Sequence, residues 1–415
     1  MNTDEKDIVK KLSPRKMMVP IVLGLAVAAF LLYLNLTDTR FEEVSGSQCG
    51  EYAWVDANGD GVVDSGDEEE FIKVENCDGQ YRLRTYKDTL GDIDWTWTST
   101  IWILMALLGM VIRDVAYMYR IRVLTDNELS WKQSFRVIML WEFASALTPS
   151  VVGGSGIAMF ILNREKINLG KSTAIVLVSA LLDELFYITM VVIVLVAIGT
   201  SYLFPINLEK TIFGTTFGTQ GLFWIGYGFI CFLTTAILIG VFFIPRTLKY
   251  LLLQIFRLPV LRRWRYNVIQ IGDDIITTSI ELKGKPLIYW IKSFGATYVS
   301  WTARYLVVNF LILAFISPES GIVSGFKEHV LIYGRQLVMW VIMLISPTPG
   351  SSGVAEFAFS GFFKEFIPLG LVGALALLWR LISYYPYLFI GAIILPRWLR
   401  ATSTKGSVNI KQKAE

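Results

Sequence analysis

Histidine and cysteine are scarce in this sequence, whose 415 residues include one histidine and three cysteines. Closely spaced zinc ligands and the glycine-rich loops that hold nucleotide phosphates are also absent, so nothing supports ATP-driven or redox chemistry. The run Gly-Gly-Ser-Gly at 153–156 lacks both the spacing and the preceding strand of a nucleophile elbow. Nucleic acid is not an expected partner, because the basic segment at 245–285 suits anionic lipid better.

Long hydrophobic runs, by contrast, are abundant. Hydrophobic residues make up 54% of the chain and fall in blocks of about 20 residues, the length that crosses a bilayer. We therefore predict an all-α polytopic membrane protein. A basic N-terminus followed by the apolar run 17–36 predicts an uncleaved signal anchor. Five further spans are expected, the last four as unbroken helices: 95–119, 172–199, 220–244, 286–316 and 368–395.

Basic residues orient these spans. Residues 245–285 hold eight Lys and Arg, whereas the loop 201–219 holds only Lys210. The positive-inside rule therefore places 245–285 and both termini in the cytoplasm of an inner-membrane protein. The stretch 248–264 is predicted to be an interfacial helix, with leucines in lipid and arginines among phosphates; a solvated linker is the alternative.

Two apolar segments, 132–163 and 327–363, are interrupted by proline, glycine and serine. The charged flanks of the first segment place both its ends on the cytoplasmic side, which predicts a re-entrant hairpin; the second enters from the outer side. Sliding the chain by 197 residues aligns 153–160 with 350–357. We therefore predict an inverted repeat of helix, re-entrant hairpin and helix, as in secondary transporters, with chance alignment as the alternative.

The expected organisation has six parts. The basic N-terminus and anchor (1–36) are followed by an outer subdomain (37–94) and the first repeat (95–200). A linking part with one span and the basic segment (201–285) then leads to the second repeat (286–400) and a cytoplasmic tail (401–415).

The motifs of the two hairpins resemble a known family. The sequences TPSVVGGSG and SPTPGSSGVAEF, followed by the mid-helix arginine of ALLWRLISYY, are similar to the transmembrane region of lysylphosphatidylglycerol synthases. The resemblance covers roughly residues 95–400 and implies a flippase-like protein that moves aminoacylated or related lipids between leaflets. We expect no cytosolic aminoacyltransferase domain after residue 400, so lipid synthesis is not implied.

Charged residues fall inside apolar segments, where each costs roughly 2.5–3.5 kcal/mol at the centre of a membrane helix. They are Glu142, Asp183, Glu184, Arg304, Arg335, Glu356 and Arg380. Acids lie mainly in the first repeat and arginines in the second, so we expect ion pairs between the repeats, with Asp183 and Glu184 facing Arg380. Such a pair either fixes how the repeats dock or contacts substrate; the sequence leaves both open.

The lipid headgroup is expected to meet the hairpin breaks and the nearby charges. Arginine and the backbone N–H groups of helices starting after the glycine motifs suit a phosphate, and the carboxylates suit a cationic headgroup. A structural kink is the alternative for the breaks. The candidate residues are Gly153, Gly154, Ser155, Gly156, Asp183, Glu184, Arg304, Pro347, Pro349, Gly350, Ser351, Ser352, Gly353, Glu356 and Arg380.

These expectations favour a transporter of membrane phospholipid over an enzyme. One alternative is a membrane-embedded lipid-modifying transferase that uses Glu356 or Asp183 as a base. Another is a non-transporting partner protein that responds to calcium. A homo-oligomer is compatible with the sequence.

The outer subdomain contains an EF-hand-like loop at 56–67. Oxygen ligands stand at loop positions 1, 3, 5, 7, 9 and 12, a glycine at position 6, and an aspartate replaces the usual glutamate at position 12. The expected calcium ligands are Asp56, Asn58, Asp60, Val62, Asp64 and Asp67, and a plain acidic turn is the alternative. Cys49 and Cys77 bracket this loop and are expected to form a disulfide on the outer side, with free thiols as the alternative.

Overall fold

The structure is a computed structural model. It describes residues 22, 26, 29–30, 33, 40–44, 49–57, 63, 68–75, 77–91, 95–148, 151–205, 210–212, 215–257, 265–316, 325–344, 348, 351–367 and 371–411. Most of the predicted anchor 17–36 therefore lies outside the described residues.

Helices dominate the described chain, as predicted. Those of the first half are α3 (Tyr86–Gly91), α4 (Trp97–Leu124), α5 (Trp131–Leu147), α6 (Val151–Arg164) and α7 (Leu169–Ile198). The second half has α8 (Thr219–Phe242), α9 (Pro245–Ile255), α10 (Arg265–Leu282), α11 (Leu287–Phe315), α12 (Phe326–Leu344), α13 (Val354–Phe363), α14 (Val372–Ser383) and α15 (Tyr385–Lys411). Short 3-10 turns, η1 (Glu68–Glu70) and η5 (Lys364–Phe366), complete the helical elements.

Five helical stretches of the described chain are long and apolar enough to cross a membrane: 97–124, 169–198, 219–242, 287–315 and 372–399. They match the five predicted spans closely. The last one, however, is not an unbroken helix. α14 ends at Ser383 and α15 begins at Tyr385, with Tyr384 outside helical geometry between them. Pro386 explains the break, because its ring lacks an N–H group and collides with the carbonyl four residues earlier.

The helices α4 and α11 pack antiparallel along their length. Trp95 lies against Phe315 at one end, while the Tyr289 hydroxyl approaches the carbonyl of Leu124 at the other. Small residues allow this close packing, since a Cβ added at Gly109 would come within 3.1 Å of the Ala303 carbonyl oxygen. These two helices form a long antiparallel pair within the bundle.

The exposed face of α4 is hydrophobic and its buried face carries arginines, the reverse of a helix surrounded by water. Its exposed large hydrophobic residues recur along one face at 101, 104, 108, 111 and 115, where lipid tails can cover them. Arg113 and Arg120 lie on the buried side, 1% and 5% exposed. Lipid would therefore surround the bundle while its charges point inward.

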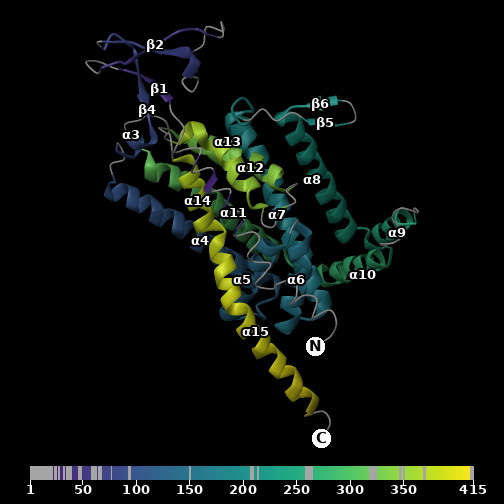
Figure 1. Cartoon of the computed structure of the whole chain (residues 1–415). Helices are drawn as coiled ribbons and strands as arrows, with labels where there is room; N and C mark the ends of the chain where they lie inside the picture. Colours follow the sequence, from purple (N-terminus) through teal and green to yellow (C-terminus); the bar gives the residue numbers. More distant parts are fainter. Residues whose placement is uncertain are drawn as a thin grey trace.

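An ion-pair network joins three helix ends on one side of the bundle, the lower side in Figure 1. Asp126, just after α4, accepts hydrogen bonds from Lys171 at the start of α7 and Lys285 before α11. Burial alone would raise the pKa of Asp126, but these two lysines outweigh it and hold the pKa below its usual value. The C-terminal end of α4 thus meets the N-terminal ends of α7 and α11.

The first hairpin, α5 and α6, has both its ends on this lower side. Gln133 and Arg136, near the start of α5, bind Glu165, which follows α6. Trp398 of α15 donates to the same carboxylate. In Figure 1 α5 and α6 occupy the lower half of the bundle, whereas α12 and α13 occupy the upper half.

Arg335 anchors the second hairpin, α12 and α13, near the upper side. It donates to the carbonyl of Phe362 near the end of α13, pairs with Glu365, and reaches the carbonyl of Tyr202 beyond the upper end of α7. The two hairpins therefore occupy opposite halves of the bundle.

Two elements outside the bundle were not predicted as β structure. Residues 40–84 contain a four-stranded antiparallel sheet in the order β1-β4-β2-β3, where β1 is Arg40–Glu43, β2 Tyr52–Trp54, β3 Phe71–Lys73 and β4 Tyr81–Arg84. A second, two-stranded ribbon joins β5 (Lys210–Ile212) and β6 (Thr215–Phe217). Phe41 and Phe71 stack at 3.9 Å between ring centroids and form the small core of the four-stranded sheet.

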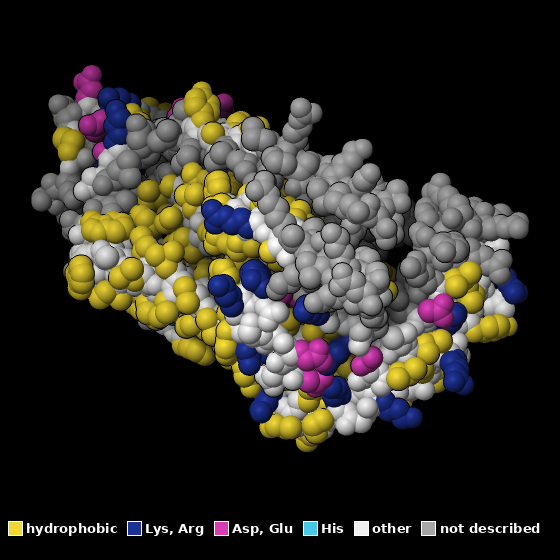
Figure 2. Space-filling model, turned by 90° about the horizontal axis from the view of Figure 1, so that it is seen from below, with side chains coloured by type: hydrophobic (Ala, Val, Ile, Leu, Met, Phe, Trp, Pro, Cys, Tyr) yellow, Lys and Arg dark blue, Asp and Glu magenta, His cyan; other side chains and the backbone are white. Residues whose placement is uncertain are grey.

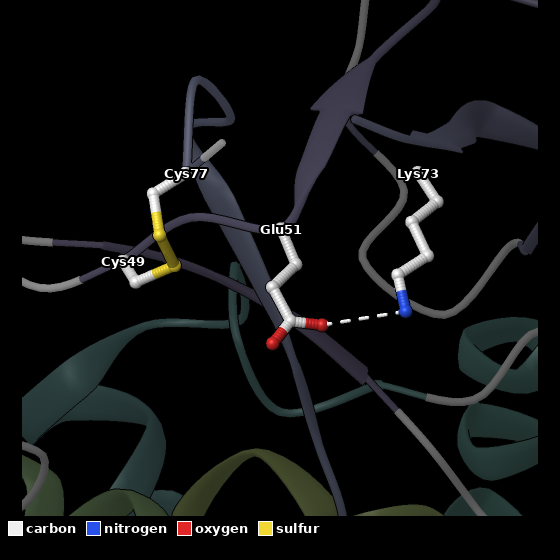
Figure 3. The surroundings of a disulfide bond; sticks show 4 residues. All are labelled: Cys49, Glu51, Lys73 and Cys77. Atoms are coloured by element: carbon white, nitrogen blue, oxygen red, sulfur yellow. Dashed lines mark ion pairs between the residues drawn. A yellow bond between two sulfur atoms is a disulfide. The ribbon is translucent and has the colours of Figure 1, made fainter. Parts of the chain in front are cut away.

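The disulfide between Cys49 and Cys77 is present and staples the start of β2 to the turn before β4. Figure 3 shows it beside the ion pair of Glu51 with Lys73, which joins β3 to the chain entering β2. The disulfide prediction is confirmed. Of the six predicted calcium ligands only Asp56 lies among the described residues.

Candidate functional site

The tips of the two hairpins meet at Tyr384, the residue between α14 and α15. Its hydroxyl donates to the carbonyl of Ala146, at the end of α5, at 3.1 Å. On the other side Ser352, in the turn that precedes α13, approaches the same hydroxyl at 3.5 Å. All three groups are buried, so one tyrosine links the break of the first hairpin to that of the second.

A buried ion pair lies next to this junction. The Arg380 Nε atom donates to Glu356 Oε1 at 2.9 Å, and the Arg380 guanidinium stacks on the Tyr384 ring at 4.2 Å from its centroid. The other carboxylate oxygen of Glu356 accepts the N–H of Gly353 at 2.7 Å, which caps α13. Gly353 has a φ of 86°, a conformation that glycine adopts at little cost. The glutamate thus holds both the hairpin break and the arginine.

Arg113 joins the first hairpin to α4 and α15. Its guanidinium binds Glu142 of α5 at 2.6 Å, Asp114 at 2.7 Å and the Tyr387 hydroxyl at 2.8 Å. It also lies over the ring of Tyr117, 4.4 Å from the centroid. Arg113 is almost fully buried, and a buried charge requires a counter-charge. The two carboxylates supply it.

Arg120, two turns further along α4, pairs with Asp183 at the middle of α7. Its guanidinium reaches both carboxylate oxygens of Asp183 and donates to Thr297 of α11. Trp301, also on α11, donates its indole N–H to Asp183 at 2.8 Å. Three helices, α4, α7 and α11, therefore converge on one carboxylate.

The acids of these clusters are accessible, whereas their arginine partners are not. The side chains of Asp114, Glu142 and Asp183 are 24%, 23% and 26% exposed. Those of Arg113 and Arg120 are 1% and 7% exposed. A group that approaches this part of the bundle would meet carboxylates first, with the guanidinium charge held behind them.

Two further charged residues stand apart from these pairs. Arg304, near the middle of α11, is half-buried over the ring of Trp301, and it has no acidic partner among the described residues. Glu184, next to Asp183, has a buried Oε2 atom with no hydrogen-bond partner in the described part of the chain. Neither charge is compensated in the way that Arg113 and Arg120 are.

The predicted pairing of Asp183 with Arg380 is wrong. Asp183 pairs with Arg120 and Arg380 with Glu356, so one pair forms within residues 95–200 and the other within 286–400. The physical reason is the geometry of α4: Arg120 lies on the buried face of this helix and reaches Asp183 at the centre of α7. Residues 95–200 and 286–400 instead contact each other through neutral groups: Tyr387 and Thr297 accept hydrogen bonds from Arg113 and Arg120, and Trp301 donates to Asp183.

The first glycine motif does not form the break of its hairpin. Gly153, Gly154, Ser155 and Gly156 lie within α6, which starts at Val151, so the helix begins before the motif rather than after it. Pro149 explains the earlier end of α5, since proline cannot continue a helix but is tolerated near the start of the next one. Gly154 serves packing, because a Cβ there would come within 2.3 Å of the Ser145 hydroxyl oxygen.

The second motif fits the prediction better. Ser351, Ser352 and Gly353 immediately precede α13, and Ser351 donates to the Met343 carbonyl near the end of α12. Serine here satisfies a backbone group that the helix end leaves unpaired. Pro347, Pro349 and Gly350 lie outside the described residues. The structure therefore brings Ser352, Gly353, Glu356 and Arg380 together, and leaves Asp183, Glu184 and Arg304 in a second group around α7 and α11.

Sequence reasoning missed several residues of these clusters, chiefly Asp114, Tyr384 and Tyr387. Arg113 and Arg120 were not predicted to face the interior of the bundle either. Their spacing of seven residues, with Tyr117 between them, places them on one helical face and could have marked them as inward-facing.

The fold and its inward-facing charges define a polytopic helical membrane protein. The profile of the lysylphosphatidylglycerol synthase TM region matches residues 84–391, and the chain belongs to this family. The chain is 25% identical over 338 residues to the UPF0104 membrane protein of Archaeoglobus fulgidus, across 74% of this chain and 90% of that relative. No solved structure matches the chain. The resemblance noted in the sequence is thus confirmed, and it links the protein to membrane lipids.

Proposed function

We propose that this protein moves the headgroup of a phospholipid or a related lipid, such as an aminoacylated or glycosylated one, between the leaflets of the inner membrane. The headgroup would pass through a polar space between two inverted repeats, while the acyl chains stay in the bilayer. The observation that carries the proposal is the charged group around α7 and α11, where Arg304 and Glu184 lack charge partners in the described chain beside accessible Asp183. Unpaired charges at membrane depth are a mark of substrate paths.

The arrangement of α4 and α11 supports the inverted repeat. The two are equivalent at the offset of 197 residues, yet they run antiparallel, as an axis in the membrane plane requires. Gly109 lies against Ala303, close to its own equivalent Leu306, so the axis would cross this contact.

The lengths of the hairpin helices support re-entrant segments. α5, α6 and α13 have 17, 14 and 10 residues, fewer than the about 20 needed to span a bilayer. Their breaks meet at buried Tyr384. In this proposal the lower side, with its many lysines and arginines in Figure 2, faces the cytoplasm together with both termini.

A matched pair of arginines allows a direct test of transport. Arg304 lies 5.4 Å from the ring of Trp301 and Arg122 lies 4.9 Å from the ring of Trp131, but Arg122 sits at the lower end of α4. Since Arg304 has no acidic partner in the described chain, Arg304→Ala uncovers no buried carboxylate there. We expect Arg304→Ala to abolish leaflet exchange of a fluorescent phospholipid in proteoliposomes, and Arg122→Ala to retain it. Arg304→Lys should be intermediate, because lysine keeps the charge but loses the two-pronged grip on phosphate.

The same liposomes separate the alternatives. Recovery of a chemically altered lipid would identify a transferase and refute transport as the main activity. If wild-type protein neither exchanges nor alters any lipid at any calcium concentration, the transport proposal fails and a partner role is favoured. Equal exchange by wild type and Arg304→Ala would remove the assigned site.

We also propose that the loop 56–67 binds calcium with the weak affinity of extracellular modules, about 10⁻⁴–10⁻³ M. Asp56, Asn58, Asp60, Val62, Asp64 and Asp67 would be its ligands. Calcium should raise the thermal midpoint of the wild type and leave that of Asp60→Ala unchanged. A shift of the same size in both proteins would contradict the proposal.

A further inference from the structure

An open pocket of about 370 Å³ lies where α8 passes into α9, and the end of α10 closes its other side. It is far along the chain from the hairpins and contains none of the residues of the proposed transport site. In Figure 1 this junction lies at the right, at about mid-height, where α9 and α10 project from the bundle. Since α8 is one of the five candidate spans and ends at Phe242, the pocket sits at the level where the membrane meets water.

Two cations line this pocket without counter-ions in the part of the chain that the structure describes. Arg246 of α9 and Lys283 after α10 are both exposed, and neither has an acidic partner among the described residues. The neighbouring Lys249, by contrast, is paired with Asp273 of α10. Two positive side chains that share one pocket repel each other, so a bound anion would stabilise the arrangement.

The remaining walls are mixed, apolar and hydroxylic. Ile244, Ile276 and Ile280 supply hydrocarbon surface, while Thr247 and Ser279 supply hydroxyl groups. On α10 the lining positions 276, 279, 280 and 283 follow the spacing of a single helix face. α9 also starts here, at Pro245, so the N–H groups of its first turn have no partner within the helix.

We propose that this pocket binds the phosphate of an anionic phospholipid from the adjacent leaflet, with an acyl chain against the isoleucines. The apolar walls and the position at the end of a membrane span favour a lipid over a soluble phosphate compound. The bound lipid fastens the α9–α10 arm to the bilayer at a place separate from the transport site. The proposal does not depend on transport.

The test uses the purified full-length protein and native mass spectrometry with added phosphatidylglycerol or phosphatidylcholine. The double variant Arg246→Gln/Lys283→Gln should bind phosphatidylglycerol about 10- to 30-fold more weakly, the effect expected of two cations at a membrane surface. The matched control Lys249→Gln/Arg257→Gln removes two charges from α9 and the turn that follows it, outside the pocket, and should change binding less than about twofold. All substituted side chains are at or near the surface, and thermal unfolding checks that both variants fold.

Several results would overturn the proposal. Equal losses in the two double variants would show diffuse attraction rather than a site. Equal binding of phosphatidylcholine by the wild type would show that headgroup charge is not recognised. Displacement of the lipid by millimolar inorganic phosphate would assign the pocket to a soluble anion. Unchanged binding in Arg246→Gln/Lys283→Gln would place the lipid elsewhere.

Discussion

Asp183→Asn and Arg120→Gln each remove one half of the same ion pair, and we expect their costs to differ. Asp183→Asn leaves the Arg120 charge in a place that is 7% exposed, with Thr297 and the ring of Tyr117 as its remaining partners. Arg120→Gln leaves the Asp183 charge 26% exposed and still bonded to the indole of Trp301. The abandoned arginine is therefore the more costly of the two.

The magnitudes follow from burial. Breaking a buried ion pair by removing one partner costs about 3–5 kcal/mol, and Asp183→Asn should fall in that range. Arg120→Gln should cost only about 1–3 kcal/mol, since water and Trp301 still solvate the carboxylate. The double variant should recover a large part of the combined loss, because neither charge is then left unpaired.

Equilibrium unfolding of the four proteins in detergent, followed by circular dichroism, measures this cycle. The exposed pair of Lys249 with Asp273 provides the control cycle, and its coupling should stay below about 1 kcal/mol. An Arg120→Gln variant less stable than Asp183→Asn would refute the assignment of burial on which the argument rests. Strict additivity in the Arg120–Asp183 cycle would show that the two side chains do not interact.

Three further outcomes are expected. Gly154→Ala should lower the thermal midpoint, because the added methyl group forces α5 and α6 apart at Ser145. Gly156→Ala is the control and should not lower the thermal midpoint, since its methyl group would meet open space. Equal effects of the two substitutions would contradict the close packing assigned to Gly154. Glu184→Met should raise thermal stability, because it removes a buried carboxylate oxygen that has no partner in the described chain. The same substitution should stop lipid exchange. Preserved exchange would exclude Glu184 from the site. Asp126→Asn should be less stable than wild type by under about 1 kcal/mol at pH 7. Because the folded pKa lies below the ordinary value of about 3.9, the difference should begin to shrink as pH falls below that value and be lost as pH falls through the folded pKa. A difference that does not change with pH would show another cause.

Much of the helical layout could be read from the sequence, because spans are set by the length of apolar runs. The break at Tyr384 was missed although Pro386 signalled it, since overall hydrophobicity masked one proline. The pairing of charges could not be predicted from the sequence, because it depends on which helices are in contact. Arg120 pairs with Asp183 only because the fold brings α4 close to α7. The sheet at 40–84 escaped notice because its strands have only three or four residues.

The candidate site shows the same division. Ser352, Gly353, Glu356 and Arg380, which the structure brings together, could be proposed from the sequence because proline, glycine and charge are unusual in an apolar run. Tyr384 was not, since a tyrosine near a membrane helix end has no such signal. Its role depends on distant partners.

A phenolic hydroxyl has a single proton to give, and Tyr384 gives it to Ala146 while Ser352 approaches the same oxygen. The end of α5 and the turn before α13 therefore contact the same side chain. Neither can withdraw from the middle of the bundle without disturbing the interruption between α14 and α15, and the Arg380 guanidinium stacked on that ring would move with it. Displacing the end of either hairpin would therefore break a contact of Tyr384.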